Sequence, residues 1–190
     1  MRPLSETEMK TMFEKLAYVE LHRASLNQLI APTSEDGTEG ERMVFRLQGS
    51  RVYYAPLALV NYATSIPRDQ LLCIGTQIGK FSKTGRFFLN ITSLSVIEKH
   101  ARFKAWLKPN GVQPFLYGGS VVRAHIGRWS EDCPGSQGIV IYDMNDTPSG
   151  FGVTTRSTAE ARKLEPTAMV IARQADCGEW LREEDTLFTT

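Results

Sequence analysis

The segment FGVTTRSTAEARKLEP, residues 151–166, gathers three positive charges within eight residues. These are Arg156, Arg162 and Lys163, and the one acid between them is Glu160. Lysine and arginine neutralise phosphates, and the planar guanidinium also binds a phosphate through two nitrogens or stacks on a flat ring. Threonine and serine hydroxyls at positions 154, 155, 157 and 158 add short donors. The segment therefore predicts a phosphate-binding rim, and a solvated surface turn is the alternative interpretation.

Two further sets of basic residues have the same chemistry. One set follows a Gly-Gly pair, and its alternation would place two members on one face of a strand: Arg123, His125 and Arg128. The other set flanks a predicted turn at Gly85, in the first half of the chain: Lys80, Lys83 and Arg86. Each set is interpreted either as a binding surface or as exposed charge that keeps the protein in solution.

Signature motifs of catalysis are absent from the sequence, which has no GxSxG, Walker, HExxH or dinucleotide fingerprint. Asp143, Asp146 and His125 could supply general acid–base chemistry, but nothing in their spacing requires it. Seven aromatic side chains could stack on bases, although burial in a core is the commoner role: Tyr53, Tyr54, Phe87, Phe88, Trp106, Tyr117 and Trp129.

Cysteine and histidine positions argue against a metal site and against a disulfide framework. Cys73, Cys133 and Cys177 are far apart and odd in number, and the three histidines are equally scattered. We expect reduced, buried or half-buried thiols, and neither a metal nor another cofactor.

Composition limits the class of protein. The chain has 190 residues, 42% hydrophobic residues and a net charge of +1, which suits one large domain or two small ones. The low net charge argues against bulk polyanion binding but permits a local basic patch. No apolar run approaches the roughly 18 residues of a membrane span, and the first ten residues lack the apolar core of a signal peptide. We expect a nuclear or cytosolic monomer without membrane association.

The first half of the chain alternates helical and strand patterns. Ser5-x-x-Glu8 is a capping box that opens a helix with an apolar face, and a second helical pattern follows up to Pro32. The acidic stretch 33–41 predicts an exposed loop. Residues 43–54 predict a hairpin, 57–66 a helix, 71–92 two strands and 93–101 a helix.

The second half changes to short strands separated by turns. Residues 137–143, 147–155 and 167–176 predict strands, and 178–185 predict a strand or a short helix. Ser157-x-x-Glu160 is a second capping box, and Phe151, between two glycines, is expected in the core. Such spacing favours a small β-barrel. We predict domains 1–98 and 99–190, which pack rigidly because no Gly/Ser linker separates them.

Three stretches of the second half resemble the PUA domain, a small RNA-binding β-barrel. They are FLYGGSVVRAHIGR, GIVIYDMNDTPSGFGV and PTAMVIARQADCGEWLR. Over nearly the whole chain, five motifs in order resemble the Nip-seven family of ribosome-biogenesis factors: MRPLSETEMKTMFEKL, IGTQIGKFSKTGRFFLNIT, FLYGGSVVRAHIGR, GFGVTTRSTAEARKLEP and QADCGEWLREEDTLF. The stretches APTSEDGTEGE and WSEDCPGSQ depart from the family pattern.

The resemblance implies an α+β protein, with an N-terminal α/β pre-PUA domain around a mostly antiparallel sheet and a C-terminal PUA barrel. It implies a non-catalytic assembly factor of the large (60S) ribosomal subunit that binds precursor rRNA and nucleolar proteins, in the nucleus and nucleolus. A small RNA-modifying enzyme, or an accessory subunit of one, is the alternative.

The resemblance also assigns an RNA face. It implies that residues 151–166 form this face, so we expect RNA contacts at Arg156, Arg162 and Lys163, with Arg123 as a weaker fourth contact. Protein partners are expected at the turn of the first domain, at Lys80, Lys83 and Arg86.

Overall fold

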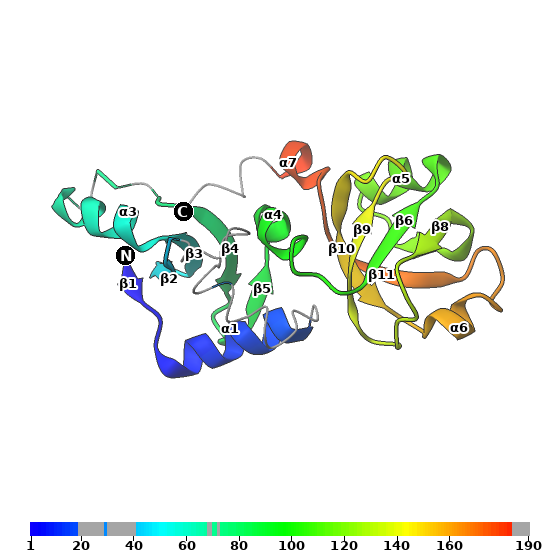
Figure 1. Cartoon of the computed structure of the whole chain (residues 1–190), viewed down its shortest axis with the longest axis horizontal. Helices are drawn as coiled ribbons and strands as arrows, with labels where there is room; N and C mark the ends of the chain where they lie inside the picture. The colour runs from blue at the N-terminus through cyan, green and yellow to red at the C-terminus, as the bar shows by residue number, and fades with distance from the viewer. Residues whose placement is uncertain (19–28, 30–40, 68–69, 72, 184–190) are drawn as a thin grey trace. The chain divides into compact units, whose positions relative to one another are not determined.

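The computed structural model describes residues 1–18, 29, 41–67, 70–71 and 73–183 (Figure 1). Met1–Ala17 and the described residues between 29 and 93 form one compact unit, and residues from Leu94 onward form another. The expected second helix before Pro32 and the expected loop 33–41 lie almost entirely outside the described residues. The domain boundary expected at residue 98 stays a prediction.

The first unit is built on an antiparallel sheet, as the sequence predicts. Its five strands lie in the order β1-β2-β3-β4-β5. Their bounds are β1 Arg2–Pro3, β2 Met43–Gln48, β3 Arg51–Pro56, β4 Thr76–Phe81 and β5 Phe87–Leu89. The predicted hairpin is β2–β3, and Gly85 takes φ 76° in the predicted turn between β4 and β5. Glycine suits that turn because it lacks the Cβ that makes positive φ costly.

Helix α1 (Glu6–Tyr18) begins at the predicted capping box. The Glu8 N–H donates to the Ser5 hydroxyl at 3.3 Å, and the Ser5 N–H donates to the Glu8 carboxylate at 2.8 Å. Arg2 also binds this carboxylate, at 2.7 Å and 2.9 Å, and lowers the pKa of Glu8 to about 2. Met12 and Leu16 of the apolar face are buried. The predicted helix at 57–66 is α3 (Leu57–Tyr62) followed by the 3-10 turn η1 (Ala63–Ser65).

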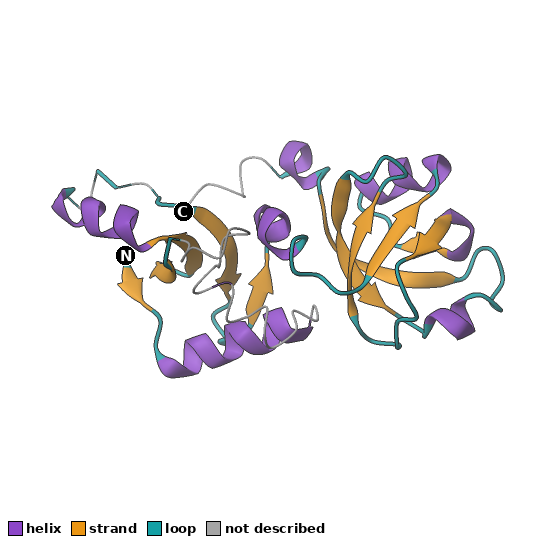
Figure 2. Cartoon of the chain, viewed as in Figure 1, coloured by secondary structure: helices purple, strands orange, loops and turns teal. Residues whose placement is uncertain are grey.

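The second unit is a curled six-stranded sheet in the order β7-β11-β10-β9-β6-β8 (Figure 2). The bounds are β6 Lys104–Leu107, β7 Val121–Val122, β8 Ile126–Trp129, β9 Gly138–Tyr142, β10 Pro148–Thr154 and β11 Met169–Asp176. Neighbours are antiparallel except β6 and β9, which are parallel. The predicted strands at 137–143, 147–155 and 167–176 are therefore confirmed. The sheet is almost closed, so its inner face forms a core.

Phe151 is buried, with 1% of its surface exposed, but it lies on the other face of the sheet. It pairs with Val140, whereas Gly150 and Gly152 pair with Ile141 and Ile139 of the inner cluster, and successive residues of a strand face opposite sides. The prediction of burial is therefore confirmed, and the expected place inside the barrel is wrong.

Gly152 follows Phe151 on β10, and a Cβ at this glycine would come within 2.6 Å of the Ala172 carbonyl oxygen on β11. Gly152 thus permits β10 and β11 to approach closely, as the glycines in the sequence predict. The buried cluster on the inner face of the barrel is Phe103, Ala105, Leu107, Phe115, Val121, Cys133, Ile139, Ile141, Ala161, Val170 and Ile171.

Short helical segments connect these strands. They are η2 (Ile91–Ser93), α4 (Leu94–Ile97), α5 (Pro109–Leu116), η3 (Arg123–His125), α6 (Thr158–Ala161) and α7 (Glu179–Arg182). The helix predicted at 93–101 is therefore shorter than expected, because residues 98–101 are not helical. The stretch 178–185, expected as a strand or a helix, is therefore helical over the part that the structure describes.

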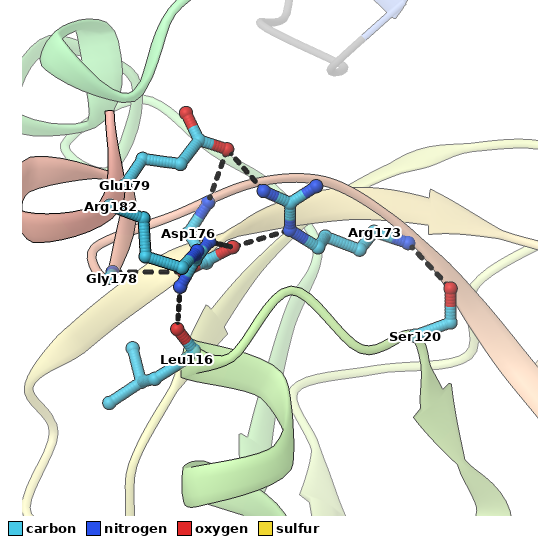
Figure 3. A network of polar contacts seen from close by, with 7 residues as sticks. All are labelled: Leu116, Ser120, Arg173, Asp176, Gly178, Glu179 and Arg182. Atoms are coloured by element: carbon cyan, nitrogen blue, oxygen red, sulfur yellow. Dashed lines mark hydrogen bonds and ion pairs between the residues drawn. The ribbon is translucent and has the colours of Figure 1, made fainter. Parts of the chain in front are cut away.

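A buried ion network fastens α7 to the barrel (Figure 3). The fully buried carboxylate of Asp176 accepts hydrogen bonds from Arg173, from Arg182 and from the Gly178 N–H. Glu179 accepts from Arg173 at 2.5 Å, and Arg182 also donates to the Leu116 carbonyl at the end of α5. Burial raises the pKa of Glu179. Because each buried acid has an arginine partner, the network holds β11, α7 and α5 in one arrangement.

The three cysteines are unpaired with one another. Cys133 is buried and Cys177 is half-buried, as expected, and burial raises the pKa of Cys177 to about 11. Cys73 is exposed, which corrects the expectation that all three are shielded. Within the described ranges, no helix is long and apolar enough to span a bilayer.

Candidate nucleic-acid interface

Four basic residues of the second unit line one groove of about 590 Å³. They are Lys108, Arg123, Arg128 and Arg162. The rest of its lining is mostly apolar, with the half-buried ring of Trp129 as the largest side chain. The four charges come from four segments: the start of α5, the turn η3, strand β8 and the end of α6.

Backbone hydrogen bonds hold η3 between two neighbouring segments. The Lys108 N–H donates to the His125 carbonyl at 2.8 Å, which ties the start of α5 to the end of η3. The N–H groups of Arg123 and Ala124 donate to the carbonyls of Ala168 and Pro166, both at 2.9 Å. The Arg123 guanidinium donates to the Leu164 carbonyl at 2.6 Å. Arg123 is therefore held along the wall of the groove.

Arg162 reaches the groove because α6 begins where the sequence predicts. Ser157 caps the helix: its hydroxyl accepts from the Glu160 N–H at 3.4 Å, and its own N–H donates to the Glu160 carboxylate at 3.2 Å. Arg162 follows the last helical residue and lies 3.6 Å from the carboxylate of Asp132. The side chains of this pair are 65% and 80% exposed, so water screens their attraction.

Two contacts hold the guanidinium of Arg128. Its guanidinium carbon lies 3.9 Å from the centre of the Trp106 ring. Its Nη2 also donates to Asp146 at 2.9 Å. The groove therefore has four cations, and exposed aspartates pair with two of them.

Two of the four predicted RNA-binding residues line the groove, and the other two do not. It brings Arg123 and Arg162 together in the groove. Arg156 and Lys163 are exposed but lie outside the groove lining. Their predicted contact with RNA stays a prediction. Lys108, which the sequence reasoning missed, joins the groove because it immediately precedes Pro109, the first residue of α5.

Two of the hydroxyls expected as phosphate donors have structural roles instead. The buried Thr154 hydroxyl donates to the Pro134 carbonyl at 2.8 Å. The buried Thr158 hydroxyl accepts from the Cys133 N–H at 2.9 Å. They hold the connection before β9 against β10 and α6. The prediction was wrong for these two because a sequence pattern does not show which neighbouring backbone a hydroxyl will meet.

The expectation that two of Arg123, His125 and Arg128 share one face of a strand is also wrong. Arg123 and His125 lie in the 3-10 turn η3, and only Arg128 belongs to strand β8. The acceptors on Pro166 and Ala168, remote in sequence, hold this turn. Arg123 and Arg128 both line the groove, although they do not share a strand face.

Two of the three residues considered for acid–base chemistry, Asp143 and Asp146, are engaged in other contacts. The Asp143 carboxylate accepts the N–H groups of Asn145 and Thr147, both at 2.8 Å. These bonds, chiefly that from Thr147, lower the pKa of Asp143. Asp146 binds Trp106 and Arg128. The groove is suited to holding a chain of phosphates, which requires charge and shape rather than a reacting group.

The basic residues of the first unit lie at the predicted turn. Lys80 is on β4, and Lys83 and Arg86 flank Gly85 between β4 and β5. All three side chains are exposed, and the Arg86 N–H donates to the Ser82 hydroxyl at 3.1 Å. The turn therefore displays charge at the surface of its unit.

Both units match models of known protein families. Residues 1–91 match the model of the NIP7/UPF0113 pre-PUA domain, and residues 103–185 match the model of the UPF0113 PUA domain. The chain is 50% identical over 190 residues to the 60S ribosome subunit biogenesis protein NIP7 of Saccharomyces cerevisiae, and the match covers all of both chains. The chain belongs to the NIP7/UPF0113 family. This confirms the resemblance seen in the sequence.

Other relatives in the NIP7/UPF0113 family match the chain over nearly their whole length. The Schizosaccharomyces pombe protein nip7 is 51% identical over 189 residues, covering 99% of this chain and all of the relative. The Danio rerio NIP7 homologue is 44% identical over 188 residues, covering 98% and 99%.

Solved structures agree on the fold. A conserved PUA-domain protein from Thermoplasma acidophilum has a TM-score of 0.55 at 10% identity, covering 99% of each chain. A hypothetical protein from Pyrococcus horikoshii has a TM-score of 0.56 at 10% identity, covering 96% of this chain and 98% of the other. The predicted architecture, a pre-PUA domain followed by a PUA barrel, is confirmed.

Proposed function

We propose that this chain is a non-catalytic assembly factor of the large ribosomal subunit that holds precursor rRNA in the groove of its PUA domain. Relatives that match it from end to end bear the name of 60S ribosome subunit biogenesis proteins. The groove with Lys108, Arg123, Arg128 and Arg162 is the observation that supports an RNA ligand. Large-subunit assembly proteins are the proposed partners of the first unit, and the nucleolus is the proposed location.

The groove suits a single strand or irregular RNA better than a long duplex. Its four cations come from four separate segments around one hollow rather than from a row along a flat face. Phosphate contacts of this kind set position and affinity without reading sequence. Binding is therefore moderate and falls as salt rises.

A salt titration against single-stranded uridine-rich RNA tests this proposal. Each phosphate neutralised on a single strand contributes about −0.7 to the slope of log affinity against log salt, so four contacts give about −2.8. Replacing Lys108 and Arg162 together by alanine should flatten the slope by about 1.4. Stability should change little, because exposed substitutions usually cost within about 0.5 kcal/mol.

The matched control removes the same charge from outside the groove, through Arg156→Ala with Lys163→Ala. If RNA follows the groove, this pair should leave the slope nearer to that of the original protein. If only the control pair flattens the slope, RNA runs along the outer side of α6 and the groove is the wrong site. Unchanged slopes for both pairs would reject the PUA domain as the phosphate-binding surface.

A tagged copy of the protein tests the cellular part of the proposal. It should concentrate in the nucleolus and sediment with large-subunit precursors. Steady exclusion from the nucleolus would contradict the assembly role, whatever the affinity for free RNA.

A further inference from the structure

Arg128 and Trp106 form a layered pair at the edge of the barrel sheet. They face each other across β8 and β6, where the two residues are antiparallel partners. The guanidinium carbon lies 3.9 Å from the ring centre, the spacing of a stacked cation–π contact. The Arg128 side chain is still 55% exposed. The guanidinium lies against the indole, and more than half of the Arg128 side chain remains exposed to solvent.

One carboxylate holds both members of the pair. The Oδ1 atom of Asp146 accepts from Trp106 Nε1 at 2.5 Å and from Arg128 Nη2 at 2.9 Å. The turn fixed by the Asp143 carboxylate places Asp146, whose backbone takes φ 61°. Aspartate tolerates this left-handed conformation better than most residues do. The orientation of the guanidinium is therefore set before any ligand arrives.

The ring of Trp106 is supported by a further layer. The ring of Tyr142 lies 5.6 Å away at an interplanar angle of 24°. Tyr142 is buried, with 8% of its surface exposed, and Lys104 lies 5.5 Å from its ring centre. Tyr142 and Trp106 are parallel partners on β9 and β6. The sheet thus provides a rigid support beneath the exposed guanidinium.

We propose that the guanidinium of Arg128 is a stacking platform for one nucleobase of the single-stranded RNA whose phosphates occupy the groove. This inference rests on the proposed RNA-binding function. Arg128 links the two features, since the residue lines the basic groove and its guanidinium covers Trp106 beside it. Bases of single-stranded RNA stack on guanidinium planes as well as on aromatic rings. A base there would form the outer layer over Arg128 and Trp106, while Asp146 keeps its hydrogen bonds.

The substitution Arg128→Lys tests the platform because it keeps the charge and removes the plane. The probes are a uridine-rich single strand and a strand of the same length whose bases are missing from consecutive positions. The original protein should prefer the strand with bases, and Arg128→Lys should lower the affinity for that strand about five- to tenfold. The affinity for the abasic strand and the salt slope should stay nearly unchanged, since both depend on charge.

Arg102→Lys is the matched control. Arg102 also lies over an aromatic ring, at 5.1 Å from the centre of Phe103, and pairs with Glu131. It does not line the groove. The ratio of affinities for the two strands should therefore be the same as in the original protein. Thermal unfolding of both variants shows whether loss of the cation–π contact has altered the fold.

Asp146→Asn provides a second test that leaves Arg128 in place. It weakens the hydrogen bond and ion pair that fix the Arg128 guanidinium, and it removes a negative charge near the groove. The abasic strand should bind as tightly as before or tighter, while the preference for bases falls.

The outcomes separate this inference from the function on which it rests. One contrary result is an equal ratio of affinities for the two strands in the original protein and in Arg128→Lys, while the groove variants still lose affinity. That result would overturn the platform and leave the proposed phosphate-binding role of the groove standing. If Arg128→Lys lost affinity equally for both strands and its salt slope became flatter, Arg128 would act through its charge alone. That result would also overturn the platform. Failure of the original protein to bind either strand would overturn both proposals.

Discussion

At the scale of single residues, the aspartates beside the groove oppose its attraction for phosphate. Asp132 pairs with Arg162 and Asp146 pairs with Arg128, and both pairs are exposed. Exposed pairs contribute little to folding because water screens them and side-chain ordering costs entropy. Their larger effect falls on the ligand, since each carboxylate repels a phosphate that approaches its arginine.

Asp132→Asn should therefore strengthen RNA binding without stabilising the protein. Two unit charges about 4 Å apart in water interact by about 1 kcal/mol, which corresponds to about fivefold in affinity at low salt. The gain should fade as salt rises, because the removed repulsion is itself screened. Filter binding at two salt concentrations measures it, and thermal unfolding should show no change beyond about 0.5 kcal/mol. Weaker binding by this variant would mean that Asp132 orders Arg162 for its ligand rather than competing with it.

At the scale of elements, the contact between β10 and β11 depends on Gly152. A Cβ at this position would meet the Ala172 carbonyl oxygen at 2.6 Å and the Ile171 side chain at 2.8 Å. The first of these is backbone, so relief requires one strand to move. The strands cannot part easily, because β10 is paired on both sides, with β9 and with β11.

Gly152→Ala should destabilise the PUA domain by about 1–3 kcal/mol, the usual cost of inserting a methyl group into a packed region. Gly135→Ala is the matched control. Its Cβ would meet its nearest atoms at 3.4 Å, and its effect should stay within about 0.5 kcal/mol. Urea unfolding of both variants makes the comparison. Equal midpoints would show that the two strands separate more readily than this packing indicates.

At the scale of the whole molecule, each compact unit has its own charged surface. The second unit contains the groove with Lys108, Arg123, Arg128 and Arg162. The first unit displays Lys80, Lys83 and Arg86 around an exposed turn. A turn suits contact with a protein surface, whereas a hollow lined by cations suits a flexible polyanion. We therefore expect the two units to divide protein contact and RNA contact between them.

Reversing charge at Lys83 and Arg86, both to glutamate, should reduce association with pre-ribosomal particles. Affinity for isolated single-stranded RNA should remain mostly intact, because neither residue lines the groove. Sedimentation of cell extracts measures the first effect, and the salt titration measures the second. The Lys108→Ala/Arg162→Ala variant is the counterpart, expected to lose free-RNA affinity first. Collapse of RNA affinity in the turn variant would reverse the roles of the two units.

Local signals in the sequence determined most of the elements. Ser5 with Glu8 and Ser157 with Glu160 form the capping boxes that their spacing predicts, since a cap needs only residues three apart. The turn at Gly85 and the buried Phe151 follow from equally local patterns. The order of five motifs was enough to place the family.

Tertiary structure decided what those elements bring together. The groove collects Lys108, Arg123, Arg128 and Arg162 from four segments, and the backbone acceptors that hold η3 are remote in sequence. The parallel pairing of β6 with β9 and the stack of Arg128 on Trp106 likewise join distant residues. A sequence shows which side chains are charged and which elements are local. Only the tertiary fold determines which of those charges line the same groove, because that depends on contacts between residues far apart in the sequence.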